Sequence, residues 1–299
     1  MQKSAVMRQI LAKQGMLIVP GVHDALSARI VEEAGFEAVY LSGSMLSSSY
    51  GMPDMNILTM TEMVSRAASI TAAVDIPLIA DADTGYGNAI NVIRTVREYE
   101  RAGAAGITLE DQVFPKKCGH YPGKAIISIP EMVGKLHAAL DCRIDKDFII
   151  VARTDAATSM GIEEAIRRSC AYIDAGADVI FVVMHKSPQI VDEARLVCSA
   201  LSKPVMFDFS LSSSHVPALP ELGSVGLKIA LIPAAITYTA ITAMRRAARE
   251  MRESGLEGVM RVLERTDPRD SILELWDVNG TIALSEKYSE QAMAAKGNS

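Results

Sequence analysis

Cysteine, uninterrupted apolar runs and clusters of basic residues are all scarce in this sequence. The four cysteines lie far apart and form no Cys-x-x-Cys pair, which disfavours both a zinc site and a disulfide framework. No stretch of eighteen apolar residues is free of charges or breakers, so we expect no membrane-spanning helix. Because the net charge is -6 and no run of Lys and Arg occurs, we expect neither nucleic acid nor a membrane as a partner.

The remaining composition is typical of a packed globular protein. The 299 residues are 49% hydrophobic and 22% charged, which excludes disordered and collagen-like classes and suffices for one large α/β domain or two smaller ones. The first 15 residues predict a short amphipathic helix and lack the apolar core of a secretory signal. We therefore expect a cytoplasmic protein.

Short β-branched apolar runs alternate with amphipathic segments along the chain. Eight runs begin at Met16, Ala38, Pro77, Gly106, Phe148, Val179, Pro204 and Leu227. The segments between them have apolar residues three and four apart, as in helices that cover a sheet. Ala-Gly pairs at Ala34, Ala102 and Ala175 are typical of helix ends. Eight such repeats in about 230 residues favour a closed (β/α)8 TIM-type barrel. We predict this barrel over residues 1–240 and additional helices over 241–299, which pack on the barrel or on a partner.

Polar residues follow several of these strands, at the ends that meet at one mouth of a parallel barrel. Asp81 and Asp83 follow the third run, Glu110 the fourth and Arg153 the fifth. Several carboxylates in one cleft would repel one another unless a cation lay among them, and all-oxygen ligation suits Mg²⁺. Structural roles stay open as well, because Asp83 can begin a turn and Arg153 can pair with Glu110 or Asp155.

A polar loop after the fourth strand, residues 113–124, has the turn formers and charges of a mobile lid. Within this lid, we expect the charges of Lys116, Lys117 and His120 to stabilise the thiolate of Cys118. A thiol that titrates near neutrality can deliver or accept a proton. Elsewhere at the mouth, Arg153 can hold a substrate carboxylate, and backbone N–H groups of residues 42–44 can face an oxyanion.

The run DADTGYGNAINVIRTVREYERAGAAGITLEDQVFPKKCGHYPGK from Asp81, together with VARTDA from Val151, resembles the isocitrate lyase and phosphoenolpyruvate mutase superfamily. The likeness extends through PGVHDALSARIVEEAGF and from YLSGS to MPD, and it covers roughly the first 160 residues. The chain length is similar to that of the compact branch, which includes methylisocitrate lyases, dimethylmalate lyases, petal death proteins and carboxyphosphonoenolpyruvate mutases. The resemblance implies a (β/α)8 barrel, often in a homotetramer whose C-terminal helices exchange between neighbours.

The resemblance also implies roles for individual residues. A Mg²⁺ ion, replaceable by Mn²⁺, would be contacted by Asp81 and held largely through water by three further acids, Asp54, Asp83 and Glu110. The 2-oxo acid portion of the substrate would be bound by Ser42, Gly43, Ser44 and Arg153. Tyr40 would handle the hydroxyl proton. The lyase loop motif is matched by Lys116, Lys117, Cys118, Gly119 and His120, with Cys118 as the acid that protonates the departing carbanion.

The activity implied is that of a Mg²⁺-dependent carbon-carbon lyase. It would cleave a 2-hydroxy (di)carboxylic acid, 2-methylisocitrate-like or alkylmalate-like, to a 2-oxo acid such as pyruvate plus a carboxylic acid. The chain departs from compact lyases at Val183, Asp208 and Tyr238, where those enzymes carry Glu, Asn and Arg. Because these groups serve the far end of the substrate, we expect an apolar or neutral group in place of one carboxylate, with Asp208 still a substrate-binding candidate. His185 or Lys186 can instead supply polarity there.

Three other functions stay open. A carboxyphosphonoenolpyruvate mutase-like enzyme of phosphonate chemistry is one alternative, and a binding or assembly subunit with altered catalysis is another. A ketopantoate hydroxymethyltransferase-like activity is the third, although the Lys-Lys-Cys-Gly-His loop has no role in it.

Overall fold

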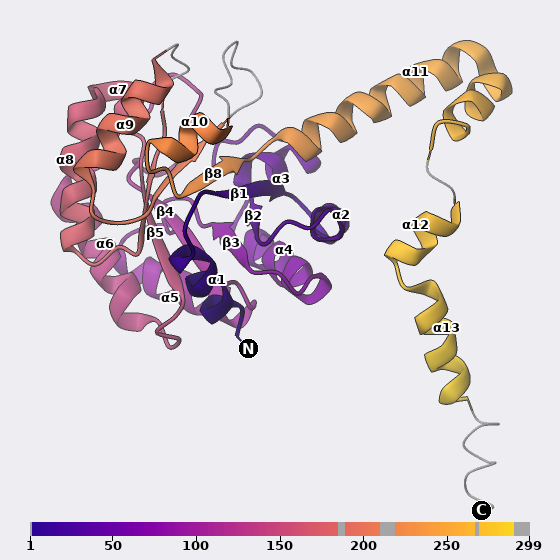
Figure 1. The fold of residues 1–299 in the computed structure, drawn as a ribbon, viewed down its shortest axis with the longest axis horizontal. Coiled ribbons are helices and arrows are strands. Elements are labelled where there is room, and N and C mark those ends of the chain that lie inside the picture. The colour runs from indigo at the N-terminus through magenta and orange to yellow at the C-terminus, as the bar shows by residue number, and fades with distance from the viewer. Residues whose placement is uncertain (1, 185–188, 210–218, 267–268, 290–299) are drawn as a thin grey trace, which may run out of the picture. The chain divides into compact units, whose positions relative to one another are not determined.

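The protein is described by a computed structural model that covers residues 2–184, 189–209, 219–266 and 269–289 (Figure 1). Eight parallel strands form a closed barrel in which each strand pairs with the next, and β1 pairs with β8 through the register of Leu17 with Ile229. The strands are β1 Leu17–Val22, β2 Val39–Leu41, β3 Leu78–Asp81, β4 Gly106–Glu110, β5 Ile149–Thr154, β6 Val179–Val182, β7 Val205–Asp208 and β8 Ile229–Ile232. The predicted (β/α)8 barrel is therefore confirmed.

Within residues 1–239, helices surround the barrel (Figure 1). Helices precede, separate and follow the strands along the chain. In chain order they are α1 Lys3–Ala12, α2 Ala25–Glu33, α3 Gly43–Ser49, α4 Met60–Ala73, α5 Ala89–Arg101, α6 Ile129–Cys142, α7 Ala157–Met160, α8 Ile162–Asp174, α9 Ile190–Ala200, α10 Leu219–Ser224, α11 Ala235–Leu263, α12 Arg269–Leu275 and α13 Val278–Lys287. Three of them end as the Ala-Gly pairs predict. Gly35, Gly103 and Gly176 have φ values of 87°, 78° and 103°, a left-handed conformation that favours glycine and ends a helix before the next strand.

Side chains alternate along each strand between two apolar clusters. One cluster fills the barrel interior and includes Val151 of β5 and Phe181 of β6. The other lies between the sheet and the helices and includes Ile150 and Ala152 of β5. Because successive side chains of a strand point to opposite faces, this alternation decides which polar residues at the strand ends reach the mouth.

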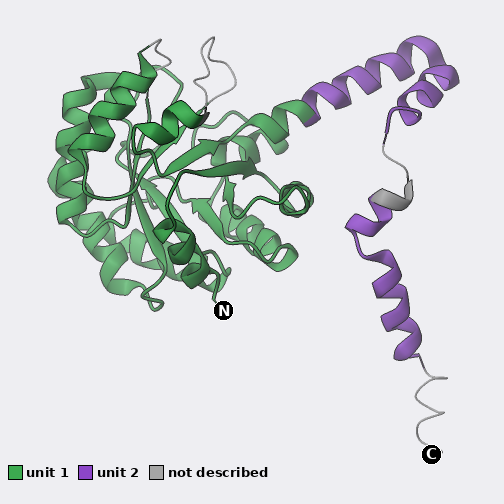
Figure 2. Cartoon of the chain, in the orientation of Figure 1, with its two compact units in different colours: residues 1–239 green, residues 240–299 purple. Residues whose placement is uncertain are grey.

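The chain divides into two compact units, residues 1–239 and 240–299 (Figure 2). The first contains the whole barrel, and the second consists of helical segments. Helix α11 crosses the boundary and is interrupted at Gly255, whose φ of 55° and ψ of -134° are not helical. Among the residues that the structure describes, no helix has the length and hydropathy needed to cross a bilayer.

Candidate active site

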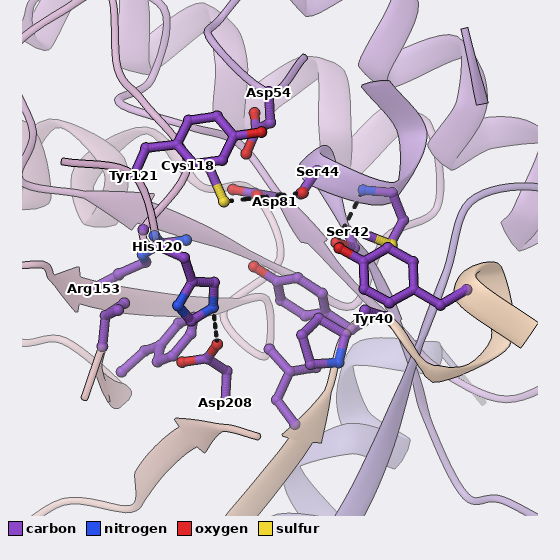
Figure 3. Close-up of a pocket in the computed structure, with 18 residues that line it drawn as sticks. Tyr40, Ser42, Ser44, Asp54, Asp81, Cys118, His120, Tyr121, Arg153 and Asp208 are labelled. Carbon is purple, nitrogen blue, oxygen red and sulfur yellow. Dashed lines mark hydrogen bonds and ion pairs between the residues drawn. The ribbon is translucent and has the colours of Figure 1, made fainter. Parts of the chain in front are cut away.

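Most of the predicted site residues meet in one cavity at the carboxyl ends of the strands (Figure 3). Those that line it are Tyr40, Ser42, Ser44, Asp54, Asp81, Cys118, Gly119, His120, Arg153 and Asp208. The other four, Gly43, Asp83, Glu110 and Lys116, each contact a residue of that lining. The barrel thus gathers residues from positions 40 to 208 in one place.

Strand alternation explains how the site is assembled. The interior cluster contains Ile79 of β3 and Val151 of β5, so Asp81 and Arg153, two positions further along, also face the interior. Residues of the fourth strand follow the same rule, because Ile107 and Leu109 face the helices and Glu110 faces the barrel. The side chains that face the barrel interior are therefore apolar along most of each strand and become charged at the carboxyl ends, where they form the mouth.

Asp83 reaches the mouth from a turn and not from a strand. β3 ends at Asp81, and Asp83 lies in the following turn with a φ of 48°. Asp83 is nevertheless buried close to Asp81, because its N–H donates to Asp81 Oδ1 at 3.2 Å. Asn56 holds the other side of this turn, donating from Nδ2 to Asp83 Oδ2 at 3.0 Å.

Lys116 of the lid is inserted among the predicted metal ligands. Its Nζ lies 2.7 Å from Asp54 Oδ1 and 3.0 Å from Asp83 Oδ1, and its side chain is 2% exposed. Burial alone would lower the pKa of Lys116, but Asp83, Glu110 and Asp54 outweigh it and hold that pKa well above its usual value. The ammonium group therefore stays charged and balances the acids.

The four predicted ligands do not form a ready-made metal centre. Among the described residues, no group of three or more His, Cys, Asp or Glu side chains is arranged to hold an ion. Burial raises the pKa of Asp83 to about 6, and burial also raises that of Glu110 well above its usual value. Glu110 Oε1 has no hydrogen-bond partner in the described part of the chain. Buried carboxylate oxygens without donors fit a hard cation, since an unpaired buried acceptor is costly.

Arg153 forms both of the ion pairs considered for it and also faces the cavity. Its Nε and NH2 atoms donate to Asp155 at 2.9 and 3.2 Å, its NH1 lies 3.2 Å from Glu110 Oε2, and its guanidinium lies over the Phe181 ring at 5.1 Å. Arg153 also lines the cavity. The predicted ion pairs are thus present, and they hold the guanidinium at the cavity wall.

The predicted oxyanion donors are largely used within the protein, which corrects the expectation for residues 42–44. The N–H of Ser42 donates to Val22 O at 3.2 Å, and the N–H of Gly43 donates to Asp81 Oδ2 at 3.3 Å. A Cβ atom on Gly43 would lie 2.9 Å from Asp81 Oδ2, so the close approach to Asp81 requires glycine. The hydroxyl of Ser44 remains at the cavity, 4.0 Å from the sulfur of Cys118.

The lid lies over the mouth, and three ion pairs attach it to the rest of the barrel. Lys116 pairs with Asp54, His120 Nε2 lies 3.0 Å from Asp208 Oδ2, and Lys124 Nζ lies 2.9 Å from Asp155 Oδ1. An antiparallel bridge between Gln112 and Ile126 closes the base of the loop. In this closed arrangement Cys118 and His120 line the cavity, as predicted.

Burial favours the neutral form of two predicted catalytic groups, Cys118 and Tyr40. Burial and the nearby charge of Asp54 raise the pKa of the Cys118 thiol, so the expected stabilisation of its thiolate was wrong. A protonated thiol is the form that can act as an acid. Burial and Asp81 raise the pKa of Tyr40 well above its usual value, so its phenol stays neutral and can donate a hydrogen bond to a substrate oxygen.

The side of the cavity formed by β6, β7 and β8 is mostly apolar. Phe181, Val183, Leu231, Pro233 and Ala234 line it, together with Asp208 and Tyr238. Val183, Asp208 and Tyr238, at which the chain departs from compact lyases, all face the cavity. His185 and Lys186 lie outside the described residues.

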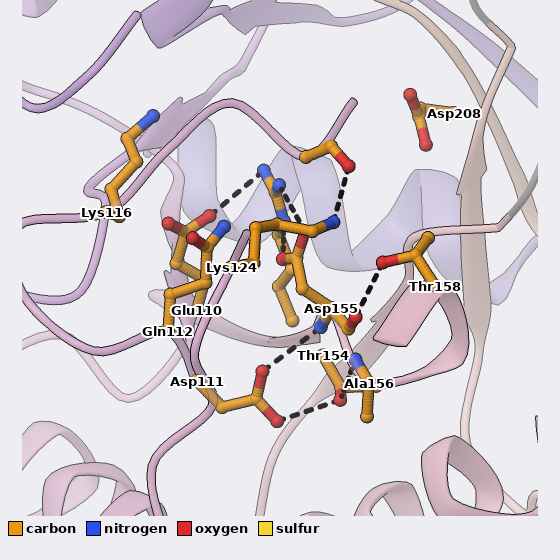
Figure 4. Close-up of polar contacts among 12 residues, drawn as sticks. Glu110, Asp111, Gln112, Lys116, Lys124, Thr154, Asp155, Ala156, Thr158 and Asp208 are labelled. Carbon is orange, nitrogen blue, oxygen red and sulfur yellow. Dashed lines mark hydrogen bonds and ion pairs between the residues drawn. The ribbon is translucent and has the colours of Figure 1, made fainter. Parts of the chain in front are cut away.

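Two charged residues of the site, Asp155 and Lys124, lie outside the set predicted to bind substrate or metal, although Asp155 was considered as an ion-pair partner of Arg153. Asp155 is fully buried and pairs with Arg153. Lys124, the last residue of the lid, also pairs with the Asp155 carboxylate (Figure 4). The signal for Asp155 was present, because it lies two positions after Arg153 and so shares its direction. Burial alone would raise the pKa of Asp155, but Arg153 and Lys124 outweigh it and lower that pKa to about 2.

The chain is similar over most of its length to several known proteins. Residues 7–252 match the family model "Phosphoenolpyruvate phosphomutase". A 2,3-dimethylmalate lyase of Eubacterium barkeri is 48% identical over 247 residues, 82% of this chain and 84% of the relative. A 2-methylisocitrate lyase of Aeropyrum pernix is 37% identical over 298 residues, 98% of this chain and 94% of the relative. The solved structure of a phosphonopyruvate hydrolase with oxalate and Mg²⁺ is 32% identical, with a TM-score of 0.87 and coverage of 96% of this chain and 99% of that one. The chain therefore belongs to the phosphoenolpyruvate phosphomutase family, within the phosphoenolpyruvate mutase/isocitrate lyase superfamily.

Proposed function

We propose that the protein is a Mg²⁺-dependent carbon-carbon lyase that cleaves a 2-hydroxy (di)carboxylic acid to a 2-oxo acid, such as pyruvate, and a carboxylic acid. The similarity to named 2,3-dimethylmalate and 2-methylisocitrate lyases supports this reaction type. The contents of the cavity support it as well, because a guanidinium, several carboxylates and a thiol face the same space. A homotetramer with exchanged C-terminal helices stays a prediction.

The acids at the ends of β3 and β4 fit a divalent cation. Asp81 and Glu110 would hold Mg²⁺ together with Asp54 and Asp83, whose carboxylates now balance Lys116. All of these donors are oxygens, which Mg²⁺ prefers and for which Mn²⁺ is a possible substitute. When bound, the cation supplies stabilisation of negative charge on the oxygens of the oxo acid.

The chain's own groups bind the substrate and move a proton. Arg153 binds the carboxylate of the oxo-acid portion, and the neutral Tyr40 phenol donates a hydrogen bond to the oxygen that becomes the carbonyl. As the carbon-carbon bond breaks, a carboxylate of the site takes the proton of the substrate hydroxyl, which becomes the carbonyl, and the electron pair of the broken bond stays with the leaving acid. The protonated Cys118 then delivers a proton to that carbon. The closed lid excludes water from these steps.

The apolar wall indicates which leaving acid fits. Of the described residues on the side formed by β6, β7 and β8, none is Lys or Arg. His120, which faces this side, is already paired with Asp208. Among the described residues, a second carboxylate on the leaving acid would therefore find no unbalanced cation, whereas an alkyl group would contact Phe181 and Val183. We infer that an alkylmalate-like substrate suits the cavity better than a methylisocitrate-like one.

The position of Cys118 is the observation that carries the proposal, since a half-buried, protonated thiol shares the cavity with Arg153 and Asp81. The test is a substrate panel of 2,3-dimethylmalate, 2-methylisocitrate and phosphonopyruvate, each with Mg²⁺ and with a chelator. Release of pyruvate from a hydroxy acid with Mg²⁺ alone supports the lyase. Conversion of phosphonopyruvate seen by phosphorus NMR, without oxo-acid release from any hydroxy acid, would favour the mutase alternative.

A further inference from the structure

The carboxylate of Asp155 joins the lid to the substrate-binding guanidinium. Lys124 Nζ lies 2.9 Å from Asp155 Oδ1, and Arg153 NH2 donates to the same oxygen at 3.2 Å. All three side chains are at least nine-tenths buried in this arrangement. Two cations that share one carboxylate oxygen in a buried site interact strongly with that oxygen and with each other.

The backbone of the lid at Gly119 also packs against the Arg153–Asp155–Lys124 cluster. Lys124 Nζ also donates to the carbonyl oxygen of Gly119. A Cβ atom at Gly119 would lie 2.7 Å from Arg153 NH2 and 3.1 Å from Asp155 Oδ1. The lid at Gly119 thus lies directly against the ion pair, and Lys124 ties it there.

The backbone of Asp155 is anchored by a hydrogen bond that does not involve the lid. Asp111, which faces outward from the barrel, accepts the N–H of Asp155 at 3.0 Å and the Thr154 hydroxyl at 2.8 Å (Figure 4). Asp111 is held in turn by the Tyr172 hydroxyl at 2.7 Å and by Arg168 NH1 at 3.3 Å, both from α8. Asp155 therefore stays at the end of β5 when Lys124 leaves.

Docking of Lys124 changes the charge that a substrate meets at Arg153. With the lid closed, two cations face the carboxylates of Asp155 and Glu110. With Lys124 withdrawn, Arg153 alone faces both. Docking of Lys124 therefore adds one positive charge beside the position of a substrate carboxylate, whatever the protonation of Glu110.

From this geometry we propose that Asp155 is a positioning residue that couples closure of the lid, through Lys124, to carboxylate binding by Arg153. The coupling is reciprocal: a bound carboxylate at Arg153 favours docking of Lys124, and docking favours the bound carboxylate. The inference rests on the proposed function insofar as Arg153 binds the 2-oxo acid.

The test uses the full chain, with oxalate as the probe and saturating Mg²⁺. Calorimetry gives the dissociation constant of oxalate for the wild type, Lys124→Met and Lys124→Arg. Lys203→Met is the control, because Lys203 is exposed in the turn before β7, at the opposite end of the barrel. We expect Lys124→Met to weaken oxalate binding at least about tenfold, a typical allosteric coupling. Lys124→Arg should keep most of the affinity, and Lys203→Met all of it.

A double-mutant cycle tests Asp155 itself. In an Asp155→Asn background, adding Lys124→Met should change the oxalate affinity less than about twofold, because no carboxylate charge remains for Lys124 to balance. A further tenfold loss would show that Lys124 acts by another route and would overturn the role of Asp155. If Asp155→Asn does not fold, the oxalate affinities of Lys124→Met and Lys124→Arg still test whether lid closure and carboxylate binding are coupled.

Limited trypsin digestion gives a second readout. Oxalate with Mg²⁺ should slow cleavage after Lys116 in the wild type and should lose this effect in Lys124→Met. Equal oxalate affinity and equal protection in Lys124→Met would overturn the inference while leaving the proposed function intact. Failure of the wild type to bind oxalate would overturn the proposed function and the inference together.

Discussion

The ammonium nitrogen of Lys116 lies 2.7 Å from Oδ1 of Asp54, and both side chains are almost fully buried. Lys116 belongs to the lid and Asp54 to the loop after α3, so this ion pair attaches the lid to the opposite rim of the cavity. Because the charges are buried, separating them exposes the lysine to solvent. The accessibility of Lys116 is therefore a direct report on lid opening.

The first prediction concerns trypsin cleavage after Lys116. The protease must bind the lysine side chain, which is 2% exposed, so cleavage requires an open lid. We expect Mg²⁺ with oxalate to slow this cleavage at least about fivefold by favouring the closed lid. Cleavage after Lys146, which is exposed in the turn before β5, is the internal control and should not change. Identical digestion rates at Lys116 with and without ligand would contradict a gating role.

Asp81→Asn should remove activity without unfolding the protein. Asn keeps an acceptor oxygen for one of the two N–H groups, since Gly43 donates to Oδ2 and Asp83 to Oδ1, but it loses the charge that a divalent cation needs. We expect turnover to fall at least about 10³-fold, which corresponds to a loss of about 4 kcal/mol of transition-state stabilisation. Asp141→Asn, on the exposed face of α6, is the matched control. Substantial turnover by Asp81→Asn would remove Asp81 from the site.

Cys118→Ser should separate binding from catalysis. A serine hydroxyl is a far weaker acid than a thiol, so protonation of the leaving carbanion becomes slow. We expect turnover to fall at least about 10²-fold, with little change in oxalate affinity. Cys170→Ser, at an exposed position on α8, should behave as the wild type. If Cys118→Ser keeps near-normal turnover, another group is the acid.

The charge on Asp155 should make stability depend on pH in a defined window. The pKa of Asp155 is lowered from 3.8 to about 2 in the folded protein. The stabilisation that the ionised carboxylate gives to the folded state is therefore complete above the pKa of the unfolded chain, and it is lost as the pH falls through the pKa of the folded protein. The stability difference between the wild type and Asp155→Asn should stay constant above about pH 5 and shrink by about 2 kcal/mol as the pH falls toward 2. Urea denaturation at pH 7, 4 and 3 measures this difference. A difference that does not change across this range would show that Asp155 is not ionised in the folded protein.

The barrel was predictable because its signals are local and repeated. Apolar runs, helical spacing and Ala-Gly helix ends recur with every unit, and the ends at Gly35, Gly103 and Gly176 were confirmed. The grouping of Asp81, Glu110 and Arg153 followed from strand ends in a parallel barrel, and the cavity brings them together. Their identification with particular roles came from the family resemblance.

What could not be predicted depends on contacts between distant segments. Nothing near Lys116 in the sequence indicates that it would insert between Asp54 and Asp83, which lie on other loops. The thiol of Cys118 illustrates the same limit. Its sequence neighbours are basic, but burial and Asp54, 64 positions away, decide its pKa.

Solvent deuterium in the leaving acid tests the central claim most directly. When 2,3-dimethylmalate or a related substrate is cleaved in deuterated water with Mg²⁺, the carbon formerly bonded to the oxo-acid portion must gain one hydrogen. The account predicts one deuterium at that carbon in the wild-type product, and slow formation of the same product in Cys118→Ser. Cleavage products without deuterium, or no oxo acid from any hydroxy acid while phosphonopyruvate is converted, would contradict a carbon-carbon lyase with Cys118 as its acid.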